Sequence, residues 1–157
     1  MKQLIVAVVA GCLLTLASCS SSNNPFSAGT WSYKGTTYSA YSAVGTSTAK
    51  SLVATYGNTG EVDNVECYFY SWPPTAGTYT IVNTQGALTS GSNVVYIVMN
   101  IGTKVYTLDN SSASSSATVS VSSDNKVSIS VAGATFSIVS TSTTDSGPFT
   151  LNVTQNI

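Results

Sequence analysis

The acidic side chains that lie closest together in the sequence are Glu61, Asp63 and Glu66. Glycoside hydrolysis needs two facing carboxylates, and a calcium ion needs about six oxygen ligands. The preceding segment, Gly57-Asn58-Thr59-Gly60, supplies loop flexibility and carbonyl oxygens, so the three acids are weak candidates for a cation site. The alternative is a solvated loop whose charges keep the surface soluble.

Two Ser-x-x-Lys strings, Ser47–Lys50 and Ser123–Lys126, come nearest to a catalytic motif. In penicillin-recognising enzymes this serine opens a helix, so that the lysine one turn later can activate it. Ser123 instead precedes a predicted hairpin turn, and no Lys-Thr-Gly follows. The chain also has no histidine, which excludes Ser-His-Asp and Cys-His catalysis. We therefore expect a protein that is not an enzyme and uses no cofactor.

Charge is scarce: five lysines, no arginine and six acids make up 7% of the 157 residues, for a net charge of −1. Nucleic-acid binding relies on a basic face that neutralises phosphates, and this sequence offers none. Zinc sites rarely do without His or several Cys, and the chain has no His and three Cys, of which Cys67 alone lies beyond residue 19. Nucleic acid is therefore not an expected partner, and no metal is expected beyond the weak cation candidates.

Aromatic residues are the stronger candidates, since nine Tyr, four Phe and two Trp are present. Trp72 precedes two prolines that could present its ring outward, and Tyr68 and Tyr70 would share its strand face. Sugars stack on such rings, and partner proteins use them as anchors. In the alternative, these rings plug the end of the fold and pack on the prolines. Four early aromatics that alternate along strands are expected in the core: Trp31, Tyr33, Tyr38 and Tyr41.

The N-terminus has the pattern of an export signal, because Lys2 is followed by an apolar run from Leu4 to Leu16 that is too short to span a bilayer. The next residues, Leu16-Ala17-Ser18-Cys19, resemble the lipobox of bacterial lipoproteins. That resemblance implies cleavage after residue 18, acylation of Cys19 and anchoring to a membrane of the cell envelope. Ser20 in place of Asp implies the outer membrane. The alternatives are a plain secretory signal and an uncleaved apolar helix.

On this interpretation the chain divides into a signal peptide (1–18), a lipidated Cys with a flexible tether (19–28) and one β domain (29–157). Its opening, Trp31-x-x-x-Gly35-x-x-Tyr38, resembles a broad class of small bacterial lipoproteins of unknown function. Once Cys12 is removed and Cys19 is acylated, Cys67 is the remaining thiol. It lies in an apolar run, so we expect a buried, inert core residue.

Hydrophobic patterning predicts an all-β fold, because Val, Thr and Tyr are frequent and apolar residues alternate with serine and threonine. About ten short strands at roughly 8–12-residue spacing favour an antiparallel β-sandwich over a barrel, here following an N-terminal signal helix. Turns are expected at Lys34-Gly35, at Gly102-Thr103 (type II′), at Asp124-Asn125 (type I′) and at Gly133. The expected strands are 30–34, 36–44, 50–56, 65–72, 77–83, 93–101, 104–108, 119–121, 127–131, 135–140 and 149–153.

Two hypotheses for function follow. The first is a binding module in which Trp72, Tyr68 and Tyr70 contact a glycan or another neutral ligand. The second is a structural or assembly subunit whose sheet edges or faces pair with other envelope proteins. Lysines near strand ends, at positions 34, 50, 104 and 126, would guard such edges against unwanted pairing.

Overall fold

The computed structural model describes residues 27–57, 63–111, 115–139 and 144–157. These residues form eleven strands and one 3₁₀ turn, so the predicted all-β class is confirmed. The expected signal helix, Cys19 and most of the tether lie outside the described residues. The elements are β1 (Gly29–Tyr33), β2 (Thr36–Ala40), β3 (Ser42–Thr46), β4 (Ser51–Tyr56), β5 (Asp63–Tyr68), β6 (Gly77–Val82), η1 (Gln85–Ala87), β7 (Val94–Ile101), β8 (Lys104–Leu108), β9 (Ser116–Val121), β10 (Val127–Ile138) and β11 (Ser146–Thr154).

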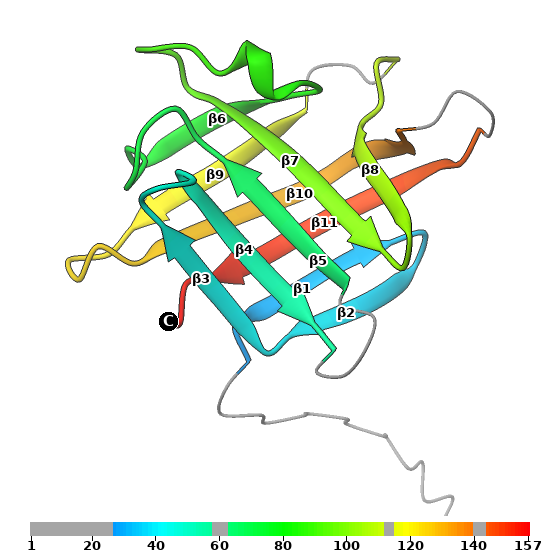
Figure 1. The fold of residues 1–157 in the computed structure, drawn as a ribbon, viewed down its shortest axis with the longest axis horizontal. Coiled ribbons are helices and arrows are strands. Elements are labelled where there is room, and N and C mark those ends of the chain that lie inside the picture. Colours follow the sequence, from blue (N-terminus) through cyan, green and yellow to red (C-terminus); the bar gives the residue numbers. More distant parts are fainter. Residues whose placement is uncertain (1–26, 58–62, 112–114, 140–143) are drawn as a thin grey trace, which may run out of the picture.

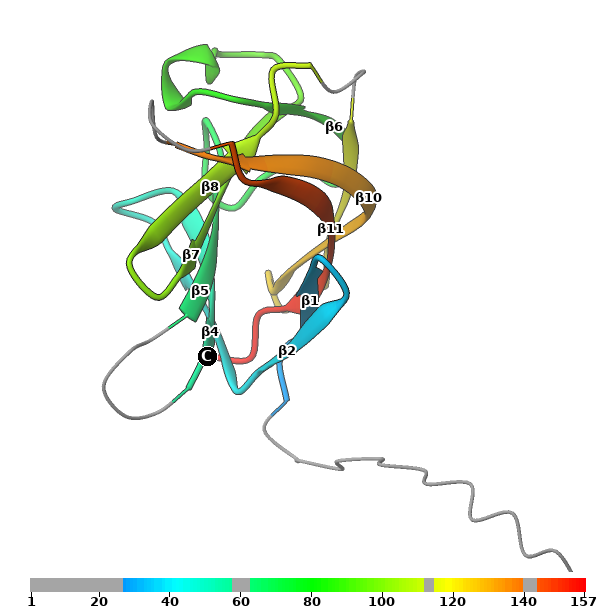
Figure 2. The same cartoon turned by 90° about the vertical axis from the view of Figure 1, so that its right-hand side faces the viewer.

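The strands belong to one sheet, in the order β2-β1-β11-β10-β9-β6-β7-β5-β4-β3. Its two arms, β2-β1-β11-β10 and β7-β5-β4-β3, face each other, and their strands cross at a steep angle (Figures 1 and 2). Strands β9 and β6 link the arms at one end, and β8 pairs with both β10 and β7 at the other. Hydrogen bonds thus run in a closed circuit through β10, β9, β6, β7 and β8. Among the pairs, β6–β7 is parallel and the rest are antiparallel.

Period-two alternation builds the core, as the sequence predicts. Val127, Ile129 and Val131 of β10 are at most 2% exposed, and the serines between them face outward. Strand β7 is paired on both sides, with β5 on one side and with β6 and β8 on the other. Cys67 is a free thiol with 1% exposure, as expected.

Several strand and turn predictions were wrong, including the expected strand 65–72, which ends at Tyr68. The expected strand 36–44 breaks at Tyr41 into β2 and β3, which lie at opposite ends of the sheet order. Tyr41 was expected in the core but is 41% exposed. The segments 127–131 and 135–140 join into the single strand β10, so Gly133 marks an irregularity in pairing and not a turn. The chain from Ser122 to Lys126 forms a longer loop in which Asn125 alone has a positive φ, so the type I′ turn is absent there.

The other two turns agree with the prediction. Gly102, with φ 55°, begins the two-residue connection between β7 and β8, and Thr103 keeps a negative φ as a type II′ turn requires. Lys34 and Gly35 both have positive φ and connect β1 to β2. Both hairpins place a lysine at one end of the molecule.

Candidate functional site

Tyr68, Tyr70 and Trp72 do not form one row, because β5 ends at Tyr68 and the next residues leave the sheet. Tyr68 lies on the outer face, where its ring stacks on Tyr96 at 6.0 Å between centroids and its hydroxyl donates to the Glu66 carboxylate. Burial, followed by that carboxylate, raises the pKa of Tyr68 to about 12. This hydroxyl is already engaged with Glu66 within the sheet.

Trp72 is half-buried and packs against the core, with its ring centroid 6.1 Å from that of Phe69. Its six-membered ring covers Gly45 of β3, where an added Cβ would collide with the ring and would lie 2.8 Å from the Gln155 side chain. Pro74 beside it is buried. This position corresponds to the alternative in which Trp72 plugs the fold.

Tyr70 is the member of the trio that remains exposed, at 44%. The Lys50 ammonium lies 5.2 Å from the centroid of its ring, a cation–π contact that fixes the ring against the β3–β4 turn. Lys50 has φ 54° and belongs to one of the Ser-x-x-Lys strings. The turn-forming backbone there differs from the helix that a Ser-Lys catalyst uses.

Tyr70 also lines a pocket of about 390 Å³ between the segment that follows β5 and the segment that precedes β7. The remaining lining residues are Ser71, Thr75, Tyr79, Ser90, Gly91, Ser92 and Asn93, so the lining has hydroxyl, amide and aromatic groups and no charge. We refer to these eight residues as the Tyr70 pocket.

Hydrogen bonds hold both walls of the Tyr70 pocket in place. The Tyr79 hydroxyl donates to the Thr75 carbonyl at 2.8 Å, and the Thr80 N–H donates to the Asn93 carbonyl at 2.9 Å. The Ser92 hydroxyl donates to the Thr89 carbonyl at 2.9 Å. Burial raises the pKa of Tyr79. The arrangement can offer several neutral donors and acceptors beside one exposed ring.

The acidic candidates do not converge. Asp63 accepts a hydrogen bond from the Gly102 N–H at 2.8 Å, whereas Glu66 accepts from Tyr68. The two are three positions apart in one strand, so their side chains leave opposite faces of the sheet. Glu61 lies outside the described residues. Within the ranges that are described, no group of three His, Cys, Asp or Glu residues is placed to hold a metal ion.

Ser123, from the other Ser-x-x-Lys string, lies in the exposed loop between β9 and β10. Its hydroxyl is 3.4 Å from the Asp124 carboxylate, with Lys126 at the end of the same loop. A long bond to its own neighbour does not activate a serine, which needs a base within hydrogen-bond reach of its proton. The loop geometry supplies no such base.

A charged cluster lies at the opposite end of β7 from the Tyr70 pocket. The Asp145 carboxylate accepts from Lys34 and, at 3.0 Å, from the Tyr106 hydroxyl, and Lys104 is 3.6 Å away. Burial, followed by Asp145, raises the pKa of Tyr106 to about 12, and the Lys34 hydrogen bond is the main cause that lowers the pKa of Asp145. The buried Tyr33 hydroxyl next to Tyr106 has no hydrogen-bond partner within the described ranges.

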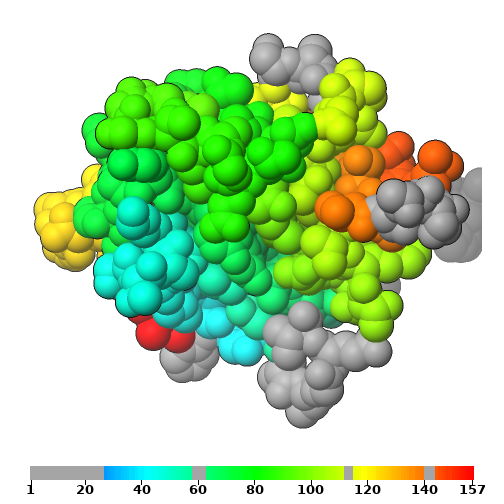
Figure 3. All heavy atoms as spheres, turned by 45° about the horizontal axis from the view of Figure 1, so that its top comes forward, coloured from blue at the N-terminus to red at the C-terminus, as the bar shows by residue number. Residues whose placement is uncertain are grey.

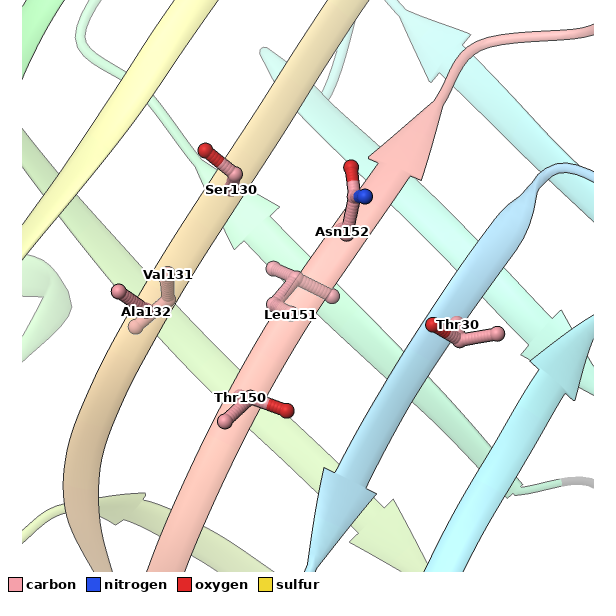
Figure 4. Close-up of a pocket in the computed structure, with 7 residues that line it drawn as sticks. All are labelled: Thr30, Ser130, Val131, Ala132, Thr150, Leu151 and Asn152. Carbon is pink, nitrogen blue, oxygen red and sulfur yellow. The ribbon is translucent and has the colours of Figure 1, made fainter.

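The outer face of β1, β11 and β10 is a third polar surface. A shallow pocket of about 280 Å³ there is lined by the side chains of Thr30, Ser130, Thr150 and Asn152, together with Val131, Ala132 and Leu151 (Figure 4). Thr30, Asn152 and Ser130 are register partners across the three strands. The surface is uncharged and rich in hydroxyls.

Sequence reasoning found Tyr70 but missed Ser90, Ser92 and Asn93, the opposite wall of its pocket. Locally these residues are a turn sequence, Ser-Gly-Ser-Asn, between two strands. The parallel pairing of β6 with β7 brings them back beside the end of β5. Parallel strands must be joined by a crossover connection. The polar segment before Val94, which ends the connection from β6 to β7, was the sequence feature that could have indicated this wall of the pocket.

No helix in the described part of the chain has the length and apolar character needed to cross a membrane. Comparison with family models, with curated proteins and with solved structures gave no match to this chain.

Proposed function

We propose that the chain is a lipid-anchored, non-catalytic, sandwich-like domain of the bacterial envelope that binds a neutral glycan in the Tyr70 pocket. The observation that carries the proposal is the combination of an exposed tyrosine ring with an uncharged lining of serine, threonine and asparagine. Sugars present apolar ring faces and many hydroxyls, which match one aromatic surface and several neutral hydrogen-bonding groups.

The position of the pocket supports the same proposal. The connection between β6 and β7 lies at the top of Figures 1 and 2, whereas the first described residues lie at the bottom. In Figure 3, with the top brought forward, the green area that includes residues 83–93 makes up a large part of that end of the surface. A tether that enters at residue 27 would therefore join the domain at the end opposite the connection between β6 and β7.

The proposal moves the ligand contact from Trp72 to Tyr70. Trp72 contributes indirectly, because its packing against Phe69 and Gly45 holds the segment that carries Tyr70 and Ser71. Tyr68 faces a different surface with Tyr96 and Glu66. Tyr70 and Asn93 then form the two sides of the contact.

Titration calorimetry of the acylated protein in detergent, with a panel of neutral oligosaccharides, tests the proposal. Tyr41→Ala is the matched control for Tyr70→Ala, since Tyr41 is similarly exposed, at 41%, and does not line this pocket. We expect saturable binding that weakens at least tenfold (about 1.4 kcal/mol) in Tyr70→Ala and Asn93→Ala and is unchanged in Tyr41→Ala. Absence of binding to every sugar, or equal binding by all variants, would refute the proposal.

A second function, as an assembly subunit, draws its support from a different part of the molecule. Strand β2 is the last strand at one end of the sheet order and is exposed at Thr36, Thr37 and Ser39. An exposed edge strand is a template for pairing with another chain.

A further inference from the structure

The two ends of the sheet, β2 and β3, are covered to different extents. At β3 the Ala43 N–H donates to the Asn156 side-chain carbonyl at 2.8 Å, and the Asn156 N–H donates to the Ala43 carbonyl at 3.0 Å. Two residues further on, Gly45 lies beneath Trp72 and Gln155. The outward main-chain groups of β3 are thus bonded or covered by the chain itself.

At β2 the outward main-chain groups belong to Thr37 and Ser39. The Lys34 N–H donates to the Pro148 carbonyl and the Thr154 N–H donates to the Ala28 carbonyl, so within β1 the even-numbered residues bond to β11 and the odd-numbered ones bond to β2. The alternation ends at Ala28, whose own N–H donates to the Ala40 carbonyl of β2 at 2.8 Å. In β2, Thr36, Tyr38 and Ala40 are therefore the residues that bond back to β1. Within the described ranges, no strand lies beside Thr37 and Ser39 on the outward side of β2.

Charge does not protect this edge. Strand β2, Thr-Thr-Tyr-Ser-Ala, contains no charged residue, proline or bulge, which are the usual devices against edge pairing. Lys34, expected to guard it, is instead bonded to Asp145 and lies over Gly147. Another strand can therefore approach Thr37 and Ser39 without meeting an unpaired lysine side chain, because β2 contains no lysine and Lys34 is paired with Asp145.

We propose that β2 pairs antiparallel with β2 of a second copy of this chain, about a two-fold axis that passes beside Tyr38. In this register Thr37 faces the partner's Ser39 and Ser39 faces the partner's Thr37. Each pair exchanges two N–H···O=C bonds, which makes four across the interface. A two-fold contact uses the same strand twice, and Thr37 and Ser39, on either side of Tyr38, are similar enough to satisfy that symmetry.

Side-chain hydroxyls support this register. On the same outer face, Ser32 and Thr150 are register partners with their hydroxyl oxygens 2.7 Å apart, and the Ser128 hydroxyl donates to Thr154 across 3.0 Å. The proposed pairing places Ser39 opposite the partner's Thr37, which is a further cross-strand hydroxyl pair of this kind. Ser130, Asn152 and Thr30 form a row across three strands (Figure 4), and Ser39 is the register partner of Thr30 in β2. The proposed pairing would continue this row into the second copy.

Sedimentation of the acylated mature protein (residues 19–157) in detergent, over a range of concentrations, tests the proposal. Ser39→Pro removes one outward N–H and no bond to β1, whereas the control Ser39→Thr keeps both the N–H and the hydroxyl. We expect a dimer whose dissociation constant rises at least tenfold in Ser39→Pro and stays within about twofold in Ser39→Thr. The amide protons of Thr37 and Ser39 should exchange more slowly as protein concentration rises.

Near-ultraviolet circular dichroism checks that the variants fold. If Ser39→Pro does not fold, Thr37→Lys serves instead, because it keeps every main-chain group and brings an ammonium to each side of the axis. A monomer at all concentrations overturns the proposal, as does a dimer that withstands the edge variants. Stoichiometric recovery of a different protein paired at this edge overturns it as well, since the edge would then serve a heterologous partner.

Discussion

Asp145 connects three segments that are distant in the sequence. Lys34 and Tyr106 donate to its carboxylate and Lys104 lies 3.6 Å from it. The hydrogen bond from Lys34 is the largest cause that lowers its pKa. Because the folded pKa lies below the unfolded value of about 3.9, the stabilisation is present above that value and is lost as the pH falls through the folded pKa.

We predict that Asp145→Asn makes the melting temperature less sensitive to acid below about pH 4, because the variant has no carboxylate to protonate there. The measurement is the melting temperature of both proteins from pH 6 to pH 2. Part of the slope should persist, since the pKa of Asp109 is also lowered, mainly by Ser111. Identical slopes in the two proteins would contradict this assignment.

Contacts of this kind between individual side chains could not be predicted from the sequence. Asp145 lies in a Ser- and Thr-rich stretch that is typical of a connecting loop, and nothing local indicates that it meets Lys34. The position of Asn93 beside Tyr70 could not be predicted either, because it depends on the parallel pairing of β6 and β7. In contrast, the burial of Trp31 and Cys67 was predictable, because Trp31 alternates with polar residues in a strand and Cys67 lies in an apolar run.

At the scale of elements, the segment after β5 is held to β3 by Trp72 and Gly45. We predict that Gly45→Ala destabilises the fold by about 1–3 kcal/mol, because the new methyl group would overlap the Trp72 ring and the Gln155 side chain. The measurement is the free energy of unfolding from a urea titration.

Gly133→Ala is the matched control for Gly45→Ala. Gly133 also lies in a strand, but a Cβ there would meet nothing within 4 Å, so a change within about 0.5 kcal/mol is expected. Equal effects of the two substitutions would show that the contact between Trp72 and Gly45 contributes little.

Strands were predictable wherever apolar and polar residues alternate, as in β10 and β11, because one face is buried and the other meets water. The ends of the strands and their pairing partners were harder to predict from the sequence. The run from Thr36 to Val44 contains no glycine or proline to mark a break, yet the chain changes from one arm of the sheet to the other at Tyr41. Propensity reports the local backbone preference, whereas pairing depends on residues far along the chain.

At the scale of the molecule, the proposed anchor at Cys19 determines where the domain acts. We predict that Cys19→Ala moves the protein from the membrane fraction to the soluble envelope fraction, because the acyl chains are the expected hold on the bilayer. Cell fractionation with immunoblotting measures this, and Ser20→Ala is the control that keeps the thiol. A Cys19→Ala protein that still sediments with membranes would refute the anchor.

The pairing of β1 with β11 has a consequence for the order of events in the cell. Residues 29–33 lie between β2 and residues 149–153, so the first strand cannot complete its hydrogen bonds until the last strand has been synthesised. Contacts between chain ends this far apart are slow to form. An exported chain of the kind we propose would benefit, since a nascent polypeptide that cannot finish folding stays competent for translocation.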